Sequence, residues 1–129
     1  MAQTKSLTIT GFALSGLFVL FMIFDITIKL MQLPVVATTM QDLGWAPAKA
    51  FTIGVIELVC VALYIFPRTA VLGAVLMMGV LGGAVATHWR IDSPLFSHDL
   101  FGVYLGLFMW GGLWLRDEKL RNVFPYRGH

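Results

Sequence analysis

Carboxylate and amine side chains interrupt otherwise apolar stretches in the first half of the chain. Asp25 and Lys29 are four residues apart, so on a helix they would share one face and could form an ion pair. Glu57 stands near the middle of the next apolar stretch. A carboxylate that is held away from water beside other charges has a pKa that its surroundings can shift, which suits it to proton transfer. Asp25 and Glu57 are therefore candidate catalytic residues, and Lys29 is a candidate for binding a negatively charged ligand group.

Imidazole and guanidinium groups stand at the ends of two later apolar stretches. His88 and Arg90 close one stretch, and His98 and Asp99 open the next. His88 is the candidate acid in the same proton chemistry, whereas Arg90, His98 and Asp99 are candidate ligand-binding residues. Imidazole and carboxylate groups also suit zinc or iron, but no closely spaced motif such as HExxH is present. We therefore predict no metal site.

The composition identifies the surroundings in which these groups must work. Hydrophobic residues make up 58% of the 129 residues and charged residues only 12%, against about 45–50% and about 25% in soluble proteins. The mean hydropathy is +0.82. The formal net charge of +2 offers no basic stripe for nucleic acid. The sequence predicts an integral membrane protein that forms one domain over residues 1–129.

Four apolar stretches are long enough to cross a bilayer, which needs roughly 20 residues. The predicted spans cover residues 7–33, 48–66, 69–89 and 97–115. We therefore predict an all-helical, antiparallel bundle of four membrane spans. The segment between the first two spans carries Val35, Val36, Met40, Leu43 and Trp45 among polar residues, which is typical of a short amphipathic helix lying at the membrane interface. The short link Phe66-Pro67-Arg68-Thr69, which includes one end residue of each span, predicts a tight antiparallel hairpin between the second and third spans.

Basic residues near the span ends predict the orientation, because Lys and Arg are retained on the cytoplasmic side. An even number of spans places both termini on one side. That side would collect Lys5, Arg68, Arg116, Lys119, Arg121 and Arg127, whereas the other side would hold Lys29, Lys49 and Arg90. We predict a multi-pass protein with both termini in the cytoplasm and with its candidate site residues in the opposite half of the membrane.

Small residues at helical spacing predict close contacts between the spans. Gly79 and Gly83 form one such pair and Gly102 and Gly106 another, and these contacts could form within one chain or between two. The single cysteine, Cys60, excludes a disulfide within the chain and a dithiol redox pair. No phosphate-binding loop, nucleophile elbow or haem attachment motif is present, so the sequence gives no support to nucleotide, serine-hydrolase or covalent haem chemistry.

Several segments together resemble the DoxX-like family of small bacterial membrane proteins. The longest are PRTAVLGA at 67–74 and LGGAVATHWR at 81–90, and shorter ones are Leu43-Gly44-Trp45 and Ile56-Glu57-Leu58. The resemblance implies a four-helix membrane bundle in the bacterial cytoplasmic membrane. The family is named after a protein similar to a subunit of thiosulfate:quinone oxidoreductase, but the resemblance assigns no catalytic residue.

Three functions fit these observations. In the first, the polar residues line an intramembrane pocket for a lipophilic small molecule such as a quinone, in a redox-linked accessory role. In the second, the protein is an acid–base enzyme, an isomerase or hydrolase, acting on a hydrophobic substrate. In the third, it is a scaffold or assembly factor that packs against a partner membrane protein or a second copy, and pairs such as Asp25 with Lys29, or Glu57 with His88 or Arg90, only hold helices together. The sequence leaves open whether the protein is an enzyme.

Overall fold

The computed structural model describes residues 5–127, and all regular structure in that part of the chain is helical. Four longer helices are joined by two short ones and a turn of π-helix, η1. Their bounds are α1 Lys5–Leu30, α2 Pro34–Asp42, α3 Lys49–Ile65, α4 Ala70–Arg90, η1 Leu95–Asp99, α5 Phe101–Arg116 and α6 Glu118–Val123. The expectation of an all-helical protein is thus confirmed, as is a short helix between the first two long ones.

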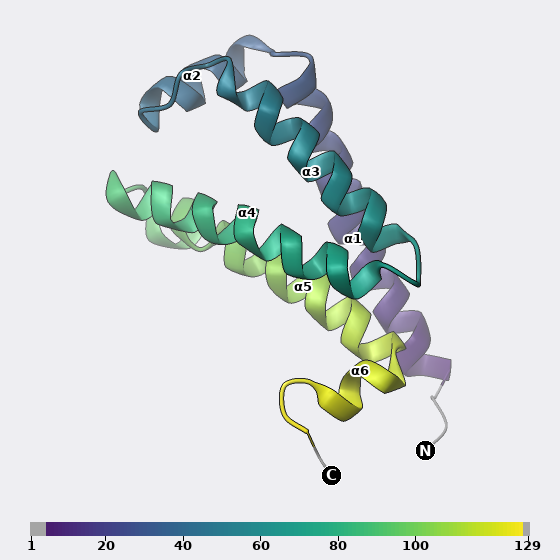
Figure 1. The fold of residues 1–129 in the computed structure, drawn as a ribbon. Coiled ribbons are helices and arrows are strands. Elements are labelled where there is room, and N and C mark those ends of the chain that lie inside the picture. Colours follow the sequence, from purple (N-terminus) through teal and green to yellow (C-terminus); the bar gives the residue numbers. More distant parts are fainter. Residues whose placement is uncertain (1–4, 128–129) are drawn as a thin grey trace.

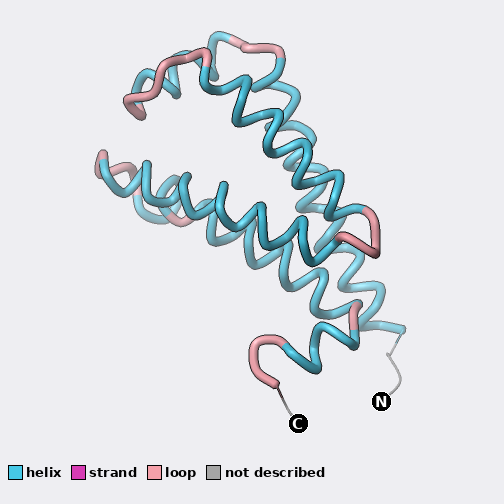
Figure 2. Tube along the Cα trace, viewed as in Figure 1, coloured by secondary structure: helices cyan, strands magenta, loops and turns pink. Residues whose placement is uncertain are grey.

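The four long helices form two arms that meet at one end and diverge at the other (Figure 1). One arm pairs α1 with α3, and the second pairs α4 with α5. Contacts of α1 with α5 and of α3 with α4 join the arms. The helix α2 lies at the wide end of one arm, whereas α6 and the start of α1 lie together near the narrow end (Figures 1 and 2). Both ends of the described chain therefore lie on the same side of the molecule.

Helix lengths differ from the predicted spans. By length and hydropathy, α1 and α4 qualify as membrane-spanning helices, with 26 and 21 residues, whereas α3 and α5 have only 17 and 16. The first helix ends at Leu30 because Gln32 takes a left-handed conformation (φ 53°) and Pro34 begins α2. The last long helix begins at Phe101, not at residue 97, because the chain after Pro94 first forms η1.

The predicted hairpin between the second and third long helices is confirmed. Only residues 66–69 separate α3 from α4, and the Thr69 hydroxyl donates to the Leu63 carbonyl at 2.7 Å. Immediately after the turn, Gly73 lies against the backbone of α3. A Cβ atom at this position would come within 2.7 Å of the Cys60 carbonyl oxygen. This close approach requires glycine.

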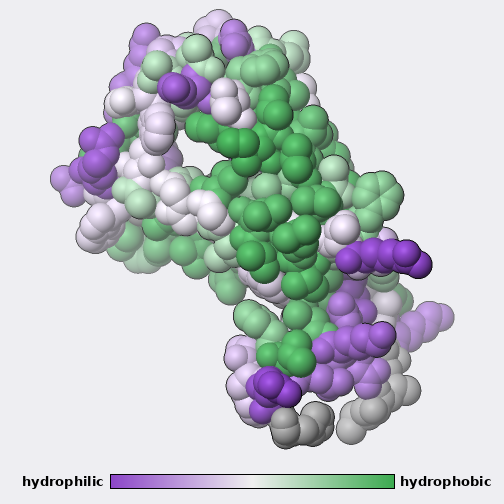
Figure 3. All heavy atoms as spheres, viewed as in Figure 1, coloured by the Kyte–Doolittle hydropathy of each residue, from purple (hydrophilic) through white to green (hydrophobic). Residues whose placement is uncertain are grey.

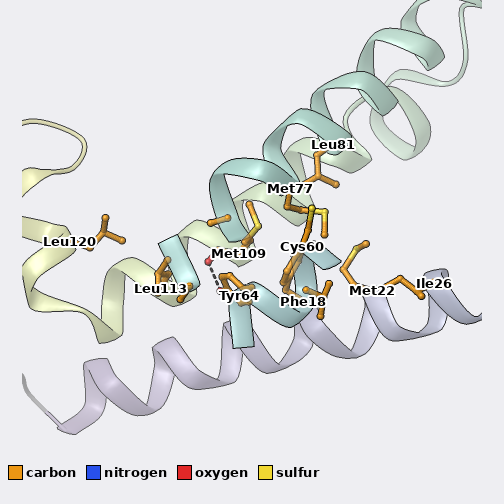
Figure 4. Packing of buried hydrophobic residues seen from close by; sticks show 13 residues of the cluster. Phe18, Met22, Ile26, Cys60, Tyr64, Met77, Leu81, Met109, Leu113 and Leu120 are labelled. Atoms are coloured by element: carbon orange, nitrogen blue, oxygen red, sulfur yellow. Dashed lines mark hydrogen bonds between the residues drawn. The ribbon is translucent and has the colours of Figure 1, made fainter. Parts of the chain in front are cut away.

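The core lies where the two arms meet. Its fully buried side chains come from all four long helices, and Figure 4 shows Phe18, Tyr64, Met77 and Met109 among them. Cys60 is also buried there. Many large apolar side chains instead face outward, as the green surface in Figure 3 shows. An apolar exterior of this kind suits contact with lipid better than contact with water.

Small residues mediate close contacts of α5 with its neighbouring helices. A Cβ atom at Gly102 would come within 2.8 Å of the Leu81 carbonyl oxygen in α4, and Gly112 lies directly against Ser15 and Gly11 in α1. The predicted contact at Gly102 and Gly106 therefore forms, and it forms within one chain.

Gly79 and Gly83 make no such contact within the described part of this chain, and a contact with a second copy stays a prediction. A Cβ atom at either residue would meet nothing within 4 Å outside its own helix. Both glycines line the space between the two arms. The spacing of small residues predicted a helix contact, but the divergence of the arms leaves these glycines facing open space.

Candidate functional site

A cavity of about 460 Å³ occupies the space between the diverging arms. Figure 3 shows the hollow between the two arms, bordered by apolar atoms on one side and by polar atoms toward the wide end. Its walls come from α1, α2, α3, α4, α5 and η1, and from the loop after α2. The lining is mostly apolar and includes the aromatic rings of Phe21, Trp45 and Phe101. This volume lies within the range of small-molecule binding sites, about 300–1,000 Å³.

An ion cluster forms the polar part of this cavity. The Lys29 Nζ atom lies 2.7 Å from Asp25 Oδ2 and 3.0 Å from Glu57 Oε1. Asp25 and Lys29 are one turn apart on α1, as their spacing predicted, whereas Glu57 reaches them from α3. The Glu57 side chain is only 4% exposed, against 23% for Asp25. One ammonium group thus compensates two carboxylates, and the partner that the structure shows for Glu57 is Lys29.

Two histidines line the cavity on the opposite arm. The rings of His88, near the end of α4, and His98, in η1, are 5.6 Å apart between centroids and meet edge to face. Their Nδ1 atoms are hydrogen-bonded to serine hydroxyls, that of His88 to Ser93 at 3.1 Å and that of His98 to Ser97 at 2.8 Å. The turn of η1 brings the second ring back toward the first. Residues that are ten apart in the sequence therefore form one polar wall.

Arg90 joins the two arms at the wide end of the cavity. Its Nη2 atom donates a hydrogen bond of 2.5 Å to the carbonyl oxygen of Leu43, in the loop that follows α2. Gly44 has a positive φ of 85°, and a side chain there would come within 3.0 Å of the same guanidinium group. Arg90 thus bridges the two arms, but this predicted ligand-binding residue is not among the residues that line the cavity.

The remaining predicted site residue, Asp99, is the last residue of η1, and its side chain lies outside the part of the chain that the structure describes. Asp25, Lys29, Glu57, His88 and His98 all line the cavity. Within residues 5–127, no group of three His, Cys, Asp or Glu side chains has an arrangement that could hold a metal ion. The ion pairs and hydrogen bonds of the five residues that line the cavity suit binding of a polar group at the edge of an apolar space.

Several lining residues were not singled out by sequence reasoning. Met40 and Val36 of α2 are buried and face the cavity, and the Thr39 and Thr87 hydroxyl groups lie on its wall. Gly79 and Gly83 also line it. The apolar residues that stand among polar ones after Pro34 were a usable signal for α2, because they indicated a helix with one apolar face. Nothing in the sequence indicated which surface that face would cover.

A second polar network, which the sequence did not suggest, lies at the narrow end. The buried Tyr64 hydroxyl donates to the Met109 carbonyl oxygen at 2.6 Å and is 2.8 Å from the Ser15 hydroxyl (Figure 4). Arg116 Nε donates to Ser15 at 3.2 Å, and its guanidinium group lies over the Phe12 ring, 4.9 Å from the centroid. Sequence reasoning could have pointed to this network, because a tyrosine inside an apolar span needs a hydrogen-bond partner. This network joins α1, α3 and α5.

The fold and the cavity define a helical protein with an apolar exterior and a polar intramolecular site. A family model described as the DoxX-like family matches residues 13–112. This chain therefore belongs to the DoxX-like family, as its sequence motifs suggested. Together with the apolar helices α1 and α4, the family assignment supports a membrane protein. Comparison with curated proteins and with solved structures finds no match.

Proposed function

We propose that this protein binds a lipophilic small molecule with a polar head, such as a quinone, in the cavity between its two arms. The observation that carries the proposal is an apolar cavity of about 460 Å³ with a charged cluster at its edge. An apolar space lined by a few convergent polar groups is the usual form of a small-molecule site. The apolar wall would hold the lipophilic part, and Asp25, Lys29 and Glu57 would contact the head.

The glycines of α4 support this proposal. Gly79 and Gly83 line the cavity, yet a side chain at either residue would meet no neighbouring atom within 4 Å. Glycine in a helix interior costs up to about 1 kcal/mol relative to alanine. Two such glycines on the cavity wall widen the space without any packing contact in return. A bound molecule against α4 would supply the missing contacts.

We further propose that all four long helices cross the bacterial cytoplasmic membrane, with both termini in the cytoplasm. With 17 and 16 residues, α3 and α5 would each extend about 25 Å, roughly 5 Å less than the hydrocarbon core, and local thinning of the bilayer can accommodate such a difference. The basic residues of α6 lie at the same end as the start of α1, which supports this orientation. The cavity would then open in the half of the membrane away from the cytoplasm.

Two adjacent glycines allow a controlled test of the cavity. Gly83 lines it, whereas Gly82 is exposed, does not line it, and also has open space around it. The Gly83→Leu variant should fill the cavity, and the Gly82→Leu variant makes the same chemical change on the same helix outside it. Each protein is purified in a mild detergent and extracted with organic solvent, and the extract is analysed by mass spectrometry and absorbance.

We expect a stoichiometric lipophilic compound in the extracts of the unaltered protein and of Gly82→Leu, and its loss from Gly83→Leu. The two variants should have similar thermal stability, because neither side chain would meet a neighbour. Retention of the compound in Gly83→Leu at the level of the control would show that the compound is bound elsewhere. The absence of any compound from the unaltered protein, together with co-purifying membrane proteins, would favour the scaffold hypothesis.

A further inference from the structure

The cavity opens sideways between α3 and α4. Beside their hairpin these helices are in contact, since Gly73 lies against the backbone of Cys60. About two and three turns further along α4, a Cβ atom at Gly79 or Gly83 would meet nothing within 4 Å outside its own helix in the described part of the chain. On α3, Ile56 lines the cavity and is 47% exposed. Figure 3 shows the hollow on the face where α3 and α4 lie in front (Figure 1), so the gap between these two helices leads into the cavity.

The opposite side of the cavity is bridged by aromatic rings. Phe21 of α1 and Phe101 of α5 both line the cavity, and their rings are 5.0 Å apart between centroids. At the wide end, the hydrogen bond from Arg90 to the Leu43 carbonyl oxygen joins the arms. The arms are thus connected at the hairpin, at the wide end and between α1 and α5, whereas the gap between α3 and α4 forms a side entrance.

The side chains that border this entrance on the outside are apolar. Leu72 and Leu76 lie on the same face of α4 as the two glycines, because residues three, four and seven apart share a helix face. Val59 follows Ile56 by three residues on α3. Leu72, Leu76 and Val59 are between 46% and 52% exposed. In the proposed position in the membrane, the entrance would therefore face the acyl chains of the lipids.

This geometry treats the head and the chain of a ligand differently. A volume of about 460 Å³ lies in the lower half of the range of small-molecule sites, so it suits a ring and the first part of a chain but not a chain of many isoprenoid units. A chain that stays among lipid tails loses nothing, because those tails are as apolar as a protein wall. Resting on the proposed function, we infer that the ligand is a long-chain lipophile whose head occupies the cavity and whose chain passes between α3 and α4 into the bilayer.

Two photoreactive probes test the path of the chain. Each is a benzoquinone with a decyl chain; one carries a diazirine group on the ring, and the other carries it at the far end of the chain. Each probe is irradiated with the full-length protein in phosphatidylcholine vesicles, and the labelled residues are identified by mass spectrometry. Specific labelling is the part that an excess of decyl benzoquinone without diazirine suppresses.

The ring probe tests the proposed site, and the chain probe tests the inference. Specific labelling by the ring probe should fall on the cavity lining, for example on Met40. Specific labelling by the chain probe should fall on Leu76 and Val59 at least about tenfold above two control residues, because a bound head holds the chain end beside the entrance at a high effective concentration. The controls are Leu20 of α1 and Leu107 of α5, which are 66% and 64% exposed but lie outside the cavity lining.

The length of the chain gives a second measurement. A longer isoprenoid chain adds carbon atoms that lie in lipid both before and after binding, so these atoms contribute no net burial. Decyl benzoquinone and a benzoquinone with such a chain should therefore suppress ring labelling equally, within about threefold, at the same mole fraction in the lipid. A chain enclosed in the cavity would make the longer compound the weaker competitor, because it exceeds the volume of about 460 Å³.

The outcomes separate the inference from the proposed function. Ring labelling in the cavity together with chain labelling at the entrance would support both. Chain labelling at Leu20 or Leu107, or a longer compound that competes more than about threefold more weakly, would overturn the chain path while leaving the cavity as a lipophile site. If the ring probe gives no specific labelling in the cavity, the proposed function itself is overturned. Both specific labels should disappear from Gly83→Leu and persist in Gly82→Leu, and their persistence in Gly83→Leu would overturn both proposals.

Discussion

The shared ammonium group of Lys29 leads to a prediction about stability. Its Nζ atom contacts Asp25 on its own helix at 2.7 Å and Glu57 on α3 at 3.0 Å. The change Lys29→Met keeps a long side chain at this position but removes the charge. It leaves two carboxylates facing each other across α1 and α3, one of them in a side chain that is only 4% exposed.

The cost follows from burial. Removal of one partner from a buried ion pair costs about 3–5 kcal/mol. Because the Lys29 and Asp25 side chains are 21% and 23% exposed, screening reduces their part, and we expect Lys29→Met to lose about 3 kcal/mol of folding free energy. Glu57→Gln keeps an acceptor for Lys29 and should cost about 1 kcal/mol. In the double variant the most buried charge is gone, so its loss should be about 2 kcal/mol smaller than the sum of the two single losses.

Reversible unfolding by a denaturing detergent in mixed micelles, followed by helical circular dichroism, measures these free energies. Lys49→Met is the control, because Lys49 begins α3 and is exposed; it should change stability by less than about 0.5 kcal/mol. Strictly additive losses in the double variant would refute the view that Lys29 compensates Glu57. A Lys29→Met variant as stable as the Lys49→Met control would refute the importance of the whole cluster.

Two further predictions concern the narrow end of the bundle, and both are checked by the same unfolding measurement. Gly73→Ala should destabilise the protein by about 1–3 kcal/mol, because its Cβ atom would come within 2.5–2.9 Å of three backbone atoms of α3. Gly82→Ala is the control and should not destabilise the protein, because a Cβ atom there meets open space. Equal stabilities of the two variants would contradict the close approach of α4 to α3. Tyr64→Phe should cost about 1–2 kcal/mol, because it leaves the buried Met109 carbonyl oxygen without its hydrogen bond of 2.6 Å. The matched control is Tyr126→Phe, since Tyr126 is 75% exposed, and a Tyr64→Phe variant that unfolds like it would show that the hydrogen bond adds nothing.

The amino-acid sequence was enough to predict the helical class and much of the candidate site. Apolar stretches separated by prolines and short polar segments predicted the long helices, because hydrophobic length and helix termination are local properties. The pair Asp25 and Lys29 followed from the helical repeat alone. The contact at Gly102 also followed from a local pattern of small residues.

Where the same local pattern gave no helix contact within the chain, the cause was the arrangement of helices in space. Gly79 and Gly83 have the spacing of Gly102 and Gly106, yet they face the cavity because α3 diverges from α4 at that level. The fourth long helix starts late because η1 is closed by a hydrogen bond from the Leu100 amide to the Leu95 carbonyl oxygen, and this turn has no apolar pattern of its own.

The sequence by itself determined that the chain is apolar, helical and a member of the DoxX-like family, and it identified the side chains able to carry charge. Only the tertiary structure decided that Lys29 serves both Asp25 and Glu57, and that Arg90 reaches the backbone of the other arm. Periodicity along a chain fixes which residues share a face of one helix. The pairing of faces between helices depends on packing over the whole bundle, and that packing created the cavity.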